Sequence, residues 1–322
     1  MSNSYNPFVA VGQALAEEMR RDPRVIMFGE GVATKRQDLV KEFGAKRVRN
    51  TPLAEGIIAG TAAGAAATGL RPVIDLLFTP FICFSMEEIV NSAGKLRYIS
   101  GGQFAFPMVA MALTGCGWTV GAQHNHNIES WFVHTPGVKV VMPSTAADFK
   151  GLLKAAIRDD NPVMFFMDIG LMHSPGEAPP DNVDHVVPIG QAAVRREGSD
   201  VTLVAYAKLV GNSLAAADEL QKVGVSAEVI DLRSLKPWDE DAVLRSVRKT
   251  GRLIVAHEAS RTCGVGAEIA ATVAERAFDA LKGPVIRIAG PDAPAPSSYA
   301  LELAFVPQAP AIVEAARKLV GR

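Results

Sequence analysis

A glutamate in the first part of the chain has the surroundings of a catalytic acid or base. Glu55 lies in the sequence TPLAEG at residues 51–56, just before a run of glycine and alanine. A carboxyl group among apolar neighbours, here Leu53, Ile57 and Ile58, tends to keep its proton and can transfer it near neutral pH. A surface carboxylate that stabilises the first turn of a helix is the alternative interpretation. The small residues that follow predict a helix against which a flat ring or a second chain could pack closely.

Strands and helices alternate along the chain, which predicts an α/β fold with a parallel sheet covered on both faces. In the first half we expect helices at 8–20, 55–66, 85–98 and 146–158, the last capped by Ser144, and strands at 25–28, 73–78, 108–113, 138–142 and 163–166. In the second half we expect strands at 201–205, 225–230, 253–256 and 285–288, and helices at 210–223, 239–249, 266–281 and 309–320. A segment rich in proline, aspartate and glycine separates the halves and predicts a linker. We therefore expect a domain at 1–175, a linker at 176–198 and a smaller domain at 199–322.

Composition excludes several classes of protein. Hydrophobic residues make up 48% of the chain and charged residues 21%, with a net charge of −1, so a large core is expected and a nucleic-acid-binding surface is not. Charged residues interrupt every long apolar run, so no membrane span is expected, and the N-terminus resembles no signal or transit peptide. The three cysteines, Cys83, Cys116 and Cys263, fit a reducing compartment, which predicts a cytoplasmic protein. We expect Cys83 and Cys116 to be buried.

Further motifs follow Glu55 in a definite order. They include LRPVID at 70–75, GAQH at 121–124, HTPGVKVV at 134–141, HEA at 257–259 and GVGAEIA at 264–270. In order and spacing they resemble the β subunit of the thiamine-diphosphate-dependent decarboxylase component of 2-oxo acid dehydrogenases, of the pyruvate, branched-chain and acetoin type. The resemblance covers nearly the whole chain. It implies a transketolase-like pyrimidine-binding domain at 1–175 and a transketolase C-terminal-like domain at 199–322.

The resemblance also implies roles for particular residues. Glu55 matches the glutamate that activates thiamine diphosphate by bonding its aminopyrimidine ring, and Phe81 matches an aromatic residue that stacks on that ring. Leu53 adjoins the same cofactor site. His124 matches the histidine that faces the substrate and the acyl acceptor, and Gln123 supports its loop. Without the resemblance, Phe81 would be interpreted as a core residue and His124 as a structural one.

A possible cation site lies at the end of the helix expected at 146–158. Asp159 and Asn161 match a potassium-binding loop of related β subunits. The backbone carbonyls of Met108, Ala156 and Ile157 would complete that loop, and hard oxygen ligands suit an alkali cation. Capping of the helix C-terminus is the alternative interpretation, and it is equally favoured.

The group that holds the diphosphate in related enzymes is missing from this chain. No Gly-Asp-Gly occurs, and the nearest glycine pair, Gly264 and Gly266, matches a helix-packing position. The resemblance therefore implies an α subunit that carries Gly-Asp-Gly and magnesium, in an assembly of two α and two β chains. The acyl fragment would pass to a lipoyl acyltransferase. An apolar surface that only the assembly covers is expected to follow.

Several positions depart from the family pattern. Residues 111–113 are Met-Ala-Leu where many members carry Arg-Gly-Pro, and residues 125–126 are Asn-His where they carry Ser-Gln. Met167 and the Leu-Met pair at 171–172 stand where many members carry Glu and then Leu-Tyr. We expect a reshaped substrate or partner surface. Half of a split transketolase and a non-catalytic scaffold are the alternative functions. The HEA-to-GVGAEIA region argues against the first, and retention of Glu55, Phe81 and His124 argues against the second.

Overall fold

The chain folds into two compact units in a computed structural model that describes residues 5–180 and 183–321. Unit 1 comprises Met1–Thr114 and Trp131–Ile189, and unit 2 comprises Gly115–Ser130 and Gly190–Arg322. The predicted α/β class is confirmed. Residues 115–130 group with the second unit, although they follow a strand of the first. In the part of the chain that the structure describes, no helix has both the length and the apolar character needed to cross a bilayer.

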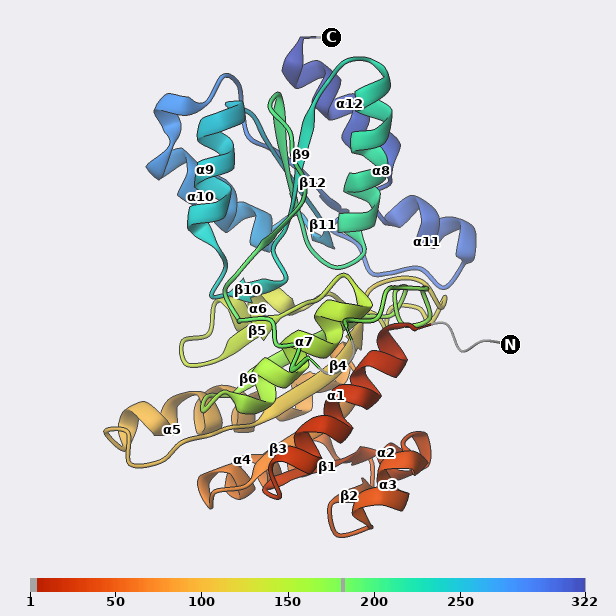
Figure 1. Cartoon of the computed structure of the whole chain (residues 1–322), viewed down its shortest axis with the longest axis vertical. Helices are drawn as coiled ribbons and strands as arrows, with labels where there is room; N and C mark the ends of the chain where they lie inside the picture. The colour runs from red at the N-terminus through yellow and green to blue at the C-terminus, as the bar shows by residue number, and fades with distance from the viewer. Residues whose placement is uncertain (1–4, 181–182, 322) are drawn as a thin grey trace. The chain divides into compact units, whose positions relative to one another are not determined.

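Unit 1 is built on parallel strands (Figure 1). They are β1 (Val25–Glu30), β2 (Val48–Thr51), β3 (Arg71–Phe78), β4 (Val109–Thr114), β5 (Lys139–Val141) and β6 (Val163–Asp168). Within the unit they lie in the order β5-β6-β4-β3-β1-β2, and every neighbouring pair is parallel. All six residues of β6 are buried, as a strand covered on both faces requires.

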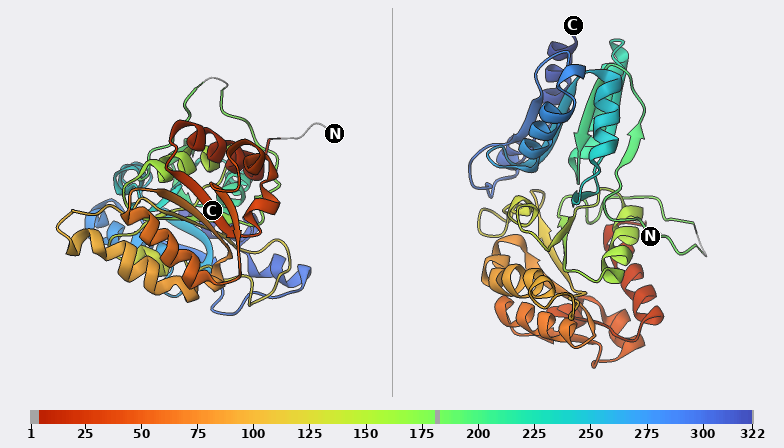
Figure 2. Two further views of the ribbon diagram at one scale, coloured as in Figure 1. Left: turned by 90° about the horizontal axis from the view of Figure 1, so that it is seen from below. Right: turned by 90° about the vertical axis from the view of Figure 1, so that its left-hand side faces the viewer.

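Helices cover both faces of this sheet (Figure 2). They are α1 (Pro7–Arg21), α2 (Val32–Lys35), α3 (Gln37–Phe43), α4 (Glu55–Ala67), η1 (Thr79–Ser85), η2 (Glu87–Ala93), α5 (Gly94–Ile99) and α7 (Ala146–Arg158), and α6 (Glu129–Val133) spans the boundary between the units. The prediction that Ser144 caps α7 is wrong. Thr145 has the extended backbone of a capping residue, and its side chain accepts a hydrogen bond from the Asp148 N–H at 3.2 Å.

The single helix expected at 85–98 is divided into η2 and α5, which follow η1. The chain enters through the 3₁₀ turns of η1, widens into the π-helical turns of η2 and becomes α-helical only at Gly94. The N–H of Gly94 bonds the carbonyl of Ile89, five residues back, which is the π-helical spacing. A side chain at Gly94 would meet the carbonyl of Ile89 and a methyl group of Val138, so the turn is tightly packed. Cys83, which we expected to be buried, is exposed on η1, whereas Cys116 is buried as predicted.

Unit 2 is a second α/β layer structure. Its strands are β7 (Ala193–Arg196), β8 (Val201–Ala205), β9 (Ala227–Asp231), β10 (Ser234–Lys236), β11 (Leu253–Ser260) and β12 (Ile286–Gly290). Its helices are α8 (Leu209–Lys222), α9 (Glu240–Thr250), α10 (Val265–Arg276), η3 (Phe278–Ala280), α11 (Tyr299–Phe305) and α12 (Ala309–Val320). Five strands form a sheet in the order β12-β11-β8-β9-β7, in which only β7 is antiparallel to its neighbour. Helices α8 and α12 cover one face and α9 and α10 the other (Figure 1).

Candidate functional site

Glu55 is the first residue of α4, just beyond the end of β2. No side chain caps this helix, and among the described residues the Glu55 carboxylate takes no hydrogen bond from the chain itself. The residue is half-buried. Leu53 and Ile57, which we expected to enclose it, are 66% and 73% exposed, and only Ile58 is buried. The residues of this chain therefore enclose the Glu55 side chain only in part.

The glycines of α4 let a neighbouring segment approach its first turns. A Cβ at Gly56 would lie 2.7 Å from the backbone carbonyl oxygen of Phe84, and one at Gly60 would lie 3.3 Å from a side-chain carbon of Glu88. Segments η1 and η2 therefore pack directly against the helix that begins with Glu55. The structure thus places Glu55 and Phe81, which η1 carries, on adjoining elements of unit 1.

Phe81 is a half-buried ring with a fixed neighbour. Its centroid lies 6.4 Å from that of Phe78, with the two planes at 76°, which is the favoured edge-to-face arrangement. The contact with Phe78 fixes the orientation of the Phe81 ring. Phe84, on the same short helix, is 71% exposed.

Gln123 and His124 lie exposed on the segment that groups with unit 2, and buried groups hold the start of that segment. The backbone N–H of Cys116 donates to one carboxylate oxygen of Glu258 at 2.5 Å. The other oxygen pairs with the Lys208 ammonium at 2.7 Å, and Lys208 also donates to the carbonyl of Cys116. The ion pair between the buried Glu258 and the partly buried Lys208 therefore fixes both backbone groups of Cys116.

Further hydrogen bonds fix the rest of the segment. The Asn125 amide donates to the Cys116 sulfur at 3.0 Å, and the Thr119 N–H donates to the Glu302 carboxylate at 3.1 Å. The Tyr206 hydroxyl donates to Glu129 at 2.8 Å. Burial raises the pKa of the Cys116 thiol to about 12, with the Glu258 charge adding to the effect, so this cysteine is no nucleophile. The segment that carries His124 is thus anchored at both ends.

The histidine of the HEA motif has a structural position. His257 is fully buried, its Nδ1 lies 3.0 Å from the Ala259 carbonyl oxygen, and its ring stacks on that of Tyr206 at 6.0 Å. Burial lowers the pKa of His257 to about 4, so the ring is neutral at pH 7. A Cβ at Gly264 or Gly266 would come within 2.7 Å of this ring, which agrees with a packing role for the two glycines.

The loop expected to bind potassium already holds cationic side chains. The Asp159 carboxylate pairs with the Lys139 ammonium at 2.5 Å and accepts from the Asn161 N–H and amide at 2.9 Å. Arg71 donates to the carbonyls of Ile157 and Asp159 at 3.0 and 3.1 Å. Burial by itself would raise the pKa of Asp159, but the contacts with Lys139 and Asn161 outweigh it and hold that pKa below its ordinary value. The Asp159 carboxylate is therefore already paired with a cationic side chain of this chain.

The Met108 carbonyl accepts the Val163 N–H at 2.9 Å, and an oxygen with two lone pairs can still accept a second partner. The capping interpretation also has support, because the Asp159 N–H bonds the Ala156 carbonyl at the end of α7.

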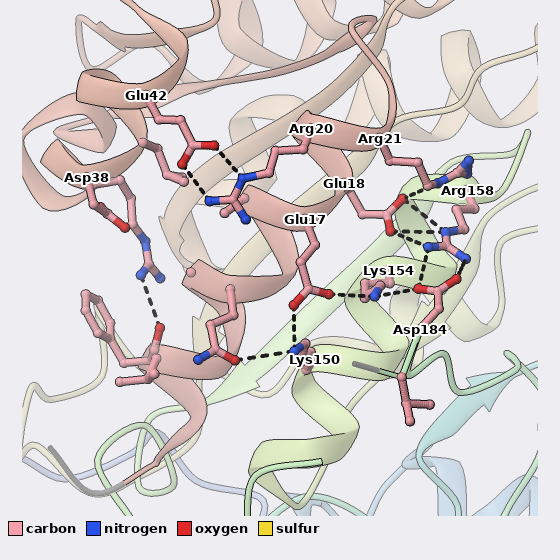
Figure 3. Close-up of a pocket in the computed structure, with 18 of the residues that line it drawn as sticks. Glu17, Glu18, Arg20, Arg21, Asp38, Glu42, Lys150, Lys154, Arg158 and Asp184 are labelled. Carbon is pink, nitrogen blue, oxygen red and sulfur yellow. Dashed lines mark hydrogen bonds and ion pairs between the residues drawn. The ribbon is translucent and has the colours of Figure 1, made fainter. Parts of the chain in front are cut away.

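A large cavity of about 1030 Å³ lies elsewhere in unit 1, over α1 and α7 (Figure 3). Its walls are charged, but many of the charges pair within the chain. Lys154 contacts Glu17 and Asp184 at 2.6 Å each, and Arg158 contacts the buried Glu18 at 2.6 Å. These pairs tie α1 to α7, and we assign the groove a structural role.

The candidate residues therefore divide between the units. Leu53, Glu55 and Phe81 lie in unit 1, whereas Gln123 and His124 lie in unit 2. Lys208, Glu258 and Glu302, which anchor the His124 segment, were not foreseen from the sequence. Glu258 stands in the HEA motif, but Lys208 and Glu302 carry no local signal, because their contacts lie 92 and 183 residues away along the chain.

Comparison with known proteins agrees with this arrangement. The transketolase pyrimidine-binding domain model matches residues 6–173, and the transketolase C-terminal domain model matches residues 190–312. The β subunit of the pyruvate dehydrogenase E1 component of Rhizobium meliloti is 43% identical over 314 residues, which cover 96% of this chain and 68% of that one. The β subunit of the acetoin:2,6-dichlorophenolindophenol oxidoreductase of Bacillus subtilis is 40% identical over 330 residues, covering 97% and 96%.

A solved structure gives the same picture of the fold. The split gene transketolase, described as an inactive β4 tetramer, superposes with a TM-score of 0.81 at 26% sequence identity and covers 99% of both chains. The identity to the dehydrogenase subunits is higher, and it extends through both units. The chain therefore belongs to the family of β subunits of thiamine-diphosphate-dependent 2-oxo acid and acetoin dehydrogenases, with a transketolase-like fold.

Proposed function

We propose that this chain works with an α subunit to decarboxylate a 2-oxo acid or to cleave an acyloin such as acetoin. The acyl fragment then passes to a lipoyl acyltransferase. The observation that carries the proposal is Glu55, a half-buried carboxylate at the head of a close-packed helix, beside the segment that presents Phe81. The relatives named for pyruvate and acetoin support the choice of substrates.

Each candidate residue has a proposed role in binding the cofactor or the substrate. Thiamine diphosphate, when bound, supplies a carbon nucleophile that attacks the substrate carbonyl. Glu55 donates a hydrogen bond to a ring nitrogen of the cofactor, and Phe81 and Leu53 provide apolar contact to that ring. His124 exchanges a proton with the substrate or the acceptor, and Gln123 supports it.

The α subunit supplies what this chain lacks. The sequence has no Gly-Asp-Gly, so we assign the diphosphate and its magnesium ion to the partner, in an assembly of two α and two β chains. The exposed apolar residues of unit 1 support a partner surface. Leu96, Ile99 and Phe104 are exposed and line a shallow pocket together with Gly60 and Gly64 of α4. A potassium ion at the backbone carbonyls near Asp159 would be a structural addition.

The test is a Glu55→Gln variant in the assembled complex. The amide keeps the size of the side chain but holds no acidic proton, so turnover should fall by at least about 100-fold. Gel filtration should show unchanged assembly, and thiamine diphosphate should still bind. Wild-type turnover in a correctly assembled variant would reject the proposed role of Glu55.

A split transketolase half is the second candidate, because the solved split gene transketolase shares the fold over the whole chain. The two functions differ in their acceptor. Ketol transfer between sugars, without acyl transfer to lipoamide, would select the transketolase. The higher identity to the dehydrogenase subunits makes the dehydrogenase the leading candidate.

A further inference from the structure

Strand β3 is irregular where it leads into η1, the short helix that carries Phe81. Between two pairing positions the strand advances three residues, from Asp75 to Phe78. Over the same stretch its neighbour β4 advances only two, from Met111 to Leu113. Strand β3 therefore contains one extra residue, which makes a β-bulge. Because side chains alternate along a strand, the extra residue changes the face toward which Phe78 points.

The backbone of this bulge has an uncommon conformation. Leu77 has a φ of 59°, in the left-handed region that residues with a side chain seldom adopt. Just before the bulge, β1 lies so close to β3 that a Cβ at Gly29 would collide with the backbone carbonyl oxygen of Asp75. A left-handed leucine persists only where its surroundings impose that conformation. Leu77 therefore depends on contacts that hold it.

The side chain of Asp75 supplies such a contact. Its Oδ1 accepts a hydrogen bond from the Leu77 N–H at 3.0 Å, the two-residue spacing at which an aspartate stabilises a turn. Its Oδ2 accepts from the Lys35 ammonium at 2.7 Å, so both carboxylate oxygens have partners. Lys35 is the last residue of α2, which follows β1. The ion pair thus keeps the carboxylate oriented toward Leu77 from an element outside β3.

The bulge determines how η1 begins. Phe78 is the last residue of β3, η1 starts at the next residue, and the Phe78 ring meets the Phe81 ring edge to face. The other end of η1 packs on α4, where the Phe84 carbonyl lies against Gly56. The direction in which Phe78 leaves the bulge therefore sets the position of the Phe81 ring.

We propose that Asp75 is a positioning residue for the cofactor site, because it fixes the bulge at Leu77 and so holds the Phe81 ring where that ring contacts thiamine diphosphate. The inference rests on the proposed function, which gives Phe81 this contact. The ion pair of Asp75 with Lys35 is partly exposed, and such pairs contribute little to stability. Loss of Asp75 is therefore expected to change cofactor affinity more than stability.

Binding of thiamine diphosphate to the assembled complex, measured by titration calorimetry, tests the inference. Phe81→Ala should raise the Kd roughly tenfold through loss of an aromatic contact, and Asp75→Ala should raise it by a similar factor. In the double variant, Asp75→Ala should add little to the effect of Phe81→Ala, because Asp75 acts through that ring. Asp38→Ala removes an exposed carboxylate of α3 and should leave the Kd unchanged.

Two further variants separate the bulge from the loss of charge. Asp75→Asn also lacks the ion pair with Lys35, but its amide oxygen can still accept from the Leu77 N–H, so the Kd should stay within about threefold of wild type. Leu77→Gly added to Asp75→Ala should restore part of the lost affinity and of any lost folding, since glycine adopts a positive φ without help. Hydrogen exchange of the cofactor-free complex should be faster at residues 79–85 in Asp75→Ala than in Asp75→Asn.

The outcomes distinguish the inference from the proposed function. An unchanged Kd in Asp75→Ala, or effects of Asp75→Ala and Phe81→Ala that multiply in the double variant, would overturn the inference and leave the proposed function standing. An unchanged Kd in Phe81→Ala would reject the proposed role of Phe81, and the inference would fail with it.

Discussion

The two carboxylate oxygens of Glu258 have different neighbours, and both contacts help to hold the backbone of Cys116 at the start of the segment that carries His124. One oxygen accepts from the Cys116 N–H, and the other meets the Lys208 ammonium, which in turn donates to the Cys116 carbonyl. Removing one member of a buried ion pair leaves an uncompensated charge, which costs more than the pair contributes. At this scale Glu258 and Lys208 act as positioning residues for a segment that neither of them adjoins in sequence.

Lys208→Met should therefore lower the free energy of unfolding by about 3–5 kcal/mol, because Glu258 stays buried without its cationic partner. The double variant Lys208→Met/Glu258→Gln should recover part of this loss, since the glutamine is neutral and still accepts from Cys116. Urea unfolding followed by circular dichroism measures both values. Lys222→Met removes the lysine of an exposed pair with Glu219 and should change stability by less than about 1 kcal/mol. Equal effects in the buried and the exposed pair would contradict the prediction.

The buried His257 predicts a pH dependence of stability. Its pKa falls from an ordinary value of 6.5 to about 4 through burial, so the folded state binds fewer protons than the unfolded state between these values. Stability should then be unaffected by this group above pH 6.5 and fall as the pH drops from 6.5 to 4, by about 3 kcal/mol. Unfolding of wild type and His257→Gln at a series of pH values checks this. The variant should lack this loss, and parallel curves in that window would refute the assignment.

At the scale of elements, the contact between α4 and η1 depends on a glycine. The backbone carbonyl of Phe84 would lie 2.7 Å from a Cβ at Gly56, whereas nothing lies within 4 Å of a Cβ at Gly64. Both glycines are in the same helix, so one position tests packing and the other tests helix propensity alone.

Gly56→Ala should destabilise the chain by about 1–3 kcal/mol, because a backbone atom must move. Gly64→Ala should stabilise it by about 0.5–1 kcal/mol, since alanine restricts the unfolded chain and space is free. Thermal unfolding of the two variants checks the opposite signs. A gain of stability in Gly56→Ala would show that η1 does not pack as described.

Periodicity predicted the helices and strands whose pattern is strong. Strand β8 and helix α12 have the bounds that we expected from the pattern of apolar residues. It did not predict β2, α11 or the division of 85–98 into η2 and α5, because short elements and π-helical turns are set by contacts distant in sequence. The local surroundings of Glu55 left a catalytic and a helix-stabilising role open, and its exposed neighbours Leu53 and Ile57 show that this chain encloses it only in part.

At the scale of the whole molecule, the exposed apolar residues of unit 1 indicate that the chain does not work alone. Ile99 is 70% exposed beside the small residues of α4, and Phe278 on unit 2 is 75% exposed outside this pocket. A charge placed where a partner covers the surface opposes assembly, whereas a charge on a free surface does not.

Ile99→Asp should therefore prevent association with the α subunit, or with a second copy of this chain, and should leave the unfolding temperature of the single chain nearly unchanged. Phe278→Asp is the matched control and should assemble normally. Sedimentation velocity of each variant with and without the α subunit measures the outcome. Assembly of Ile99→Asp as tight as wild type would place the partner surface elsewhere.

The grouping of residues 115–130 with unit 2 has a consequence for exchanging parts between relatives. Cys116 and Thr119 are encoded ahead of β5, yet Lys208, Glu258 and Glu302 hold them. A chimera of two relatives joined at a single crossover near residue 190 would take residues 115–130 from one relative and the side chains that bond to them from the other. Three crossovers, one on each side of residues 115–130 and one near residue 190, would exchange the whole of unit 2 and keep the recombined pieces compatible.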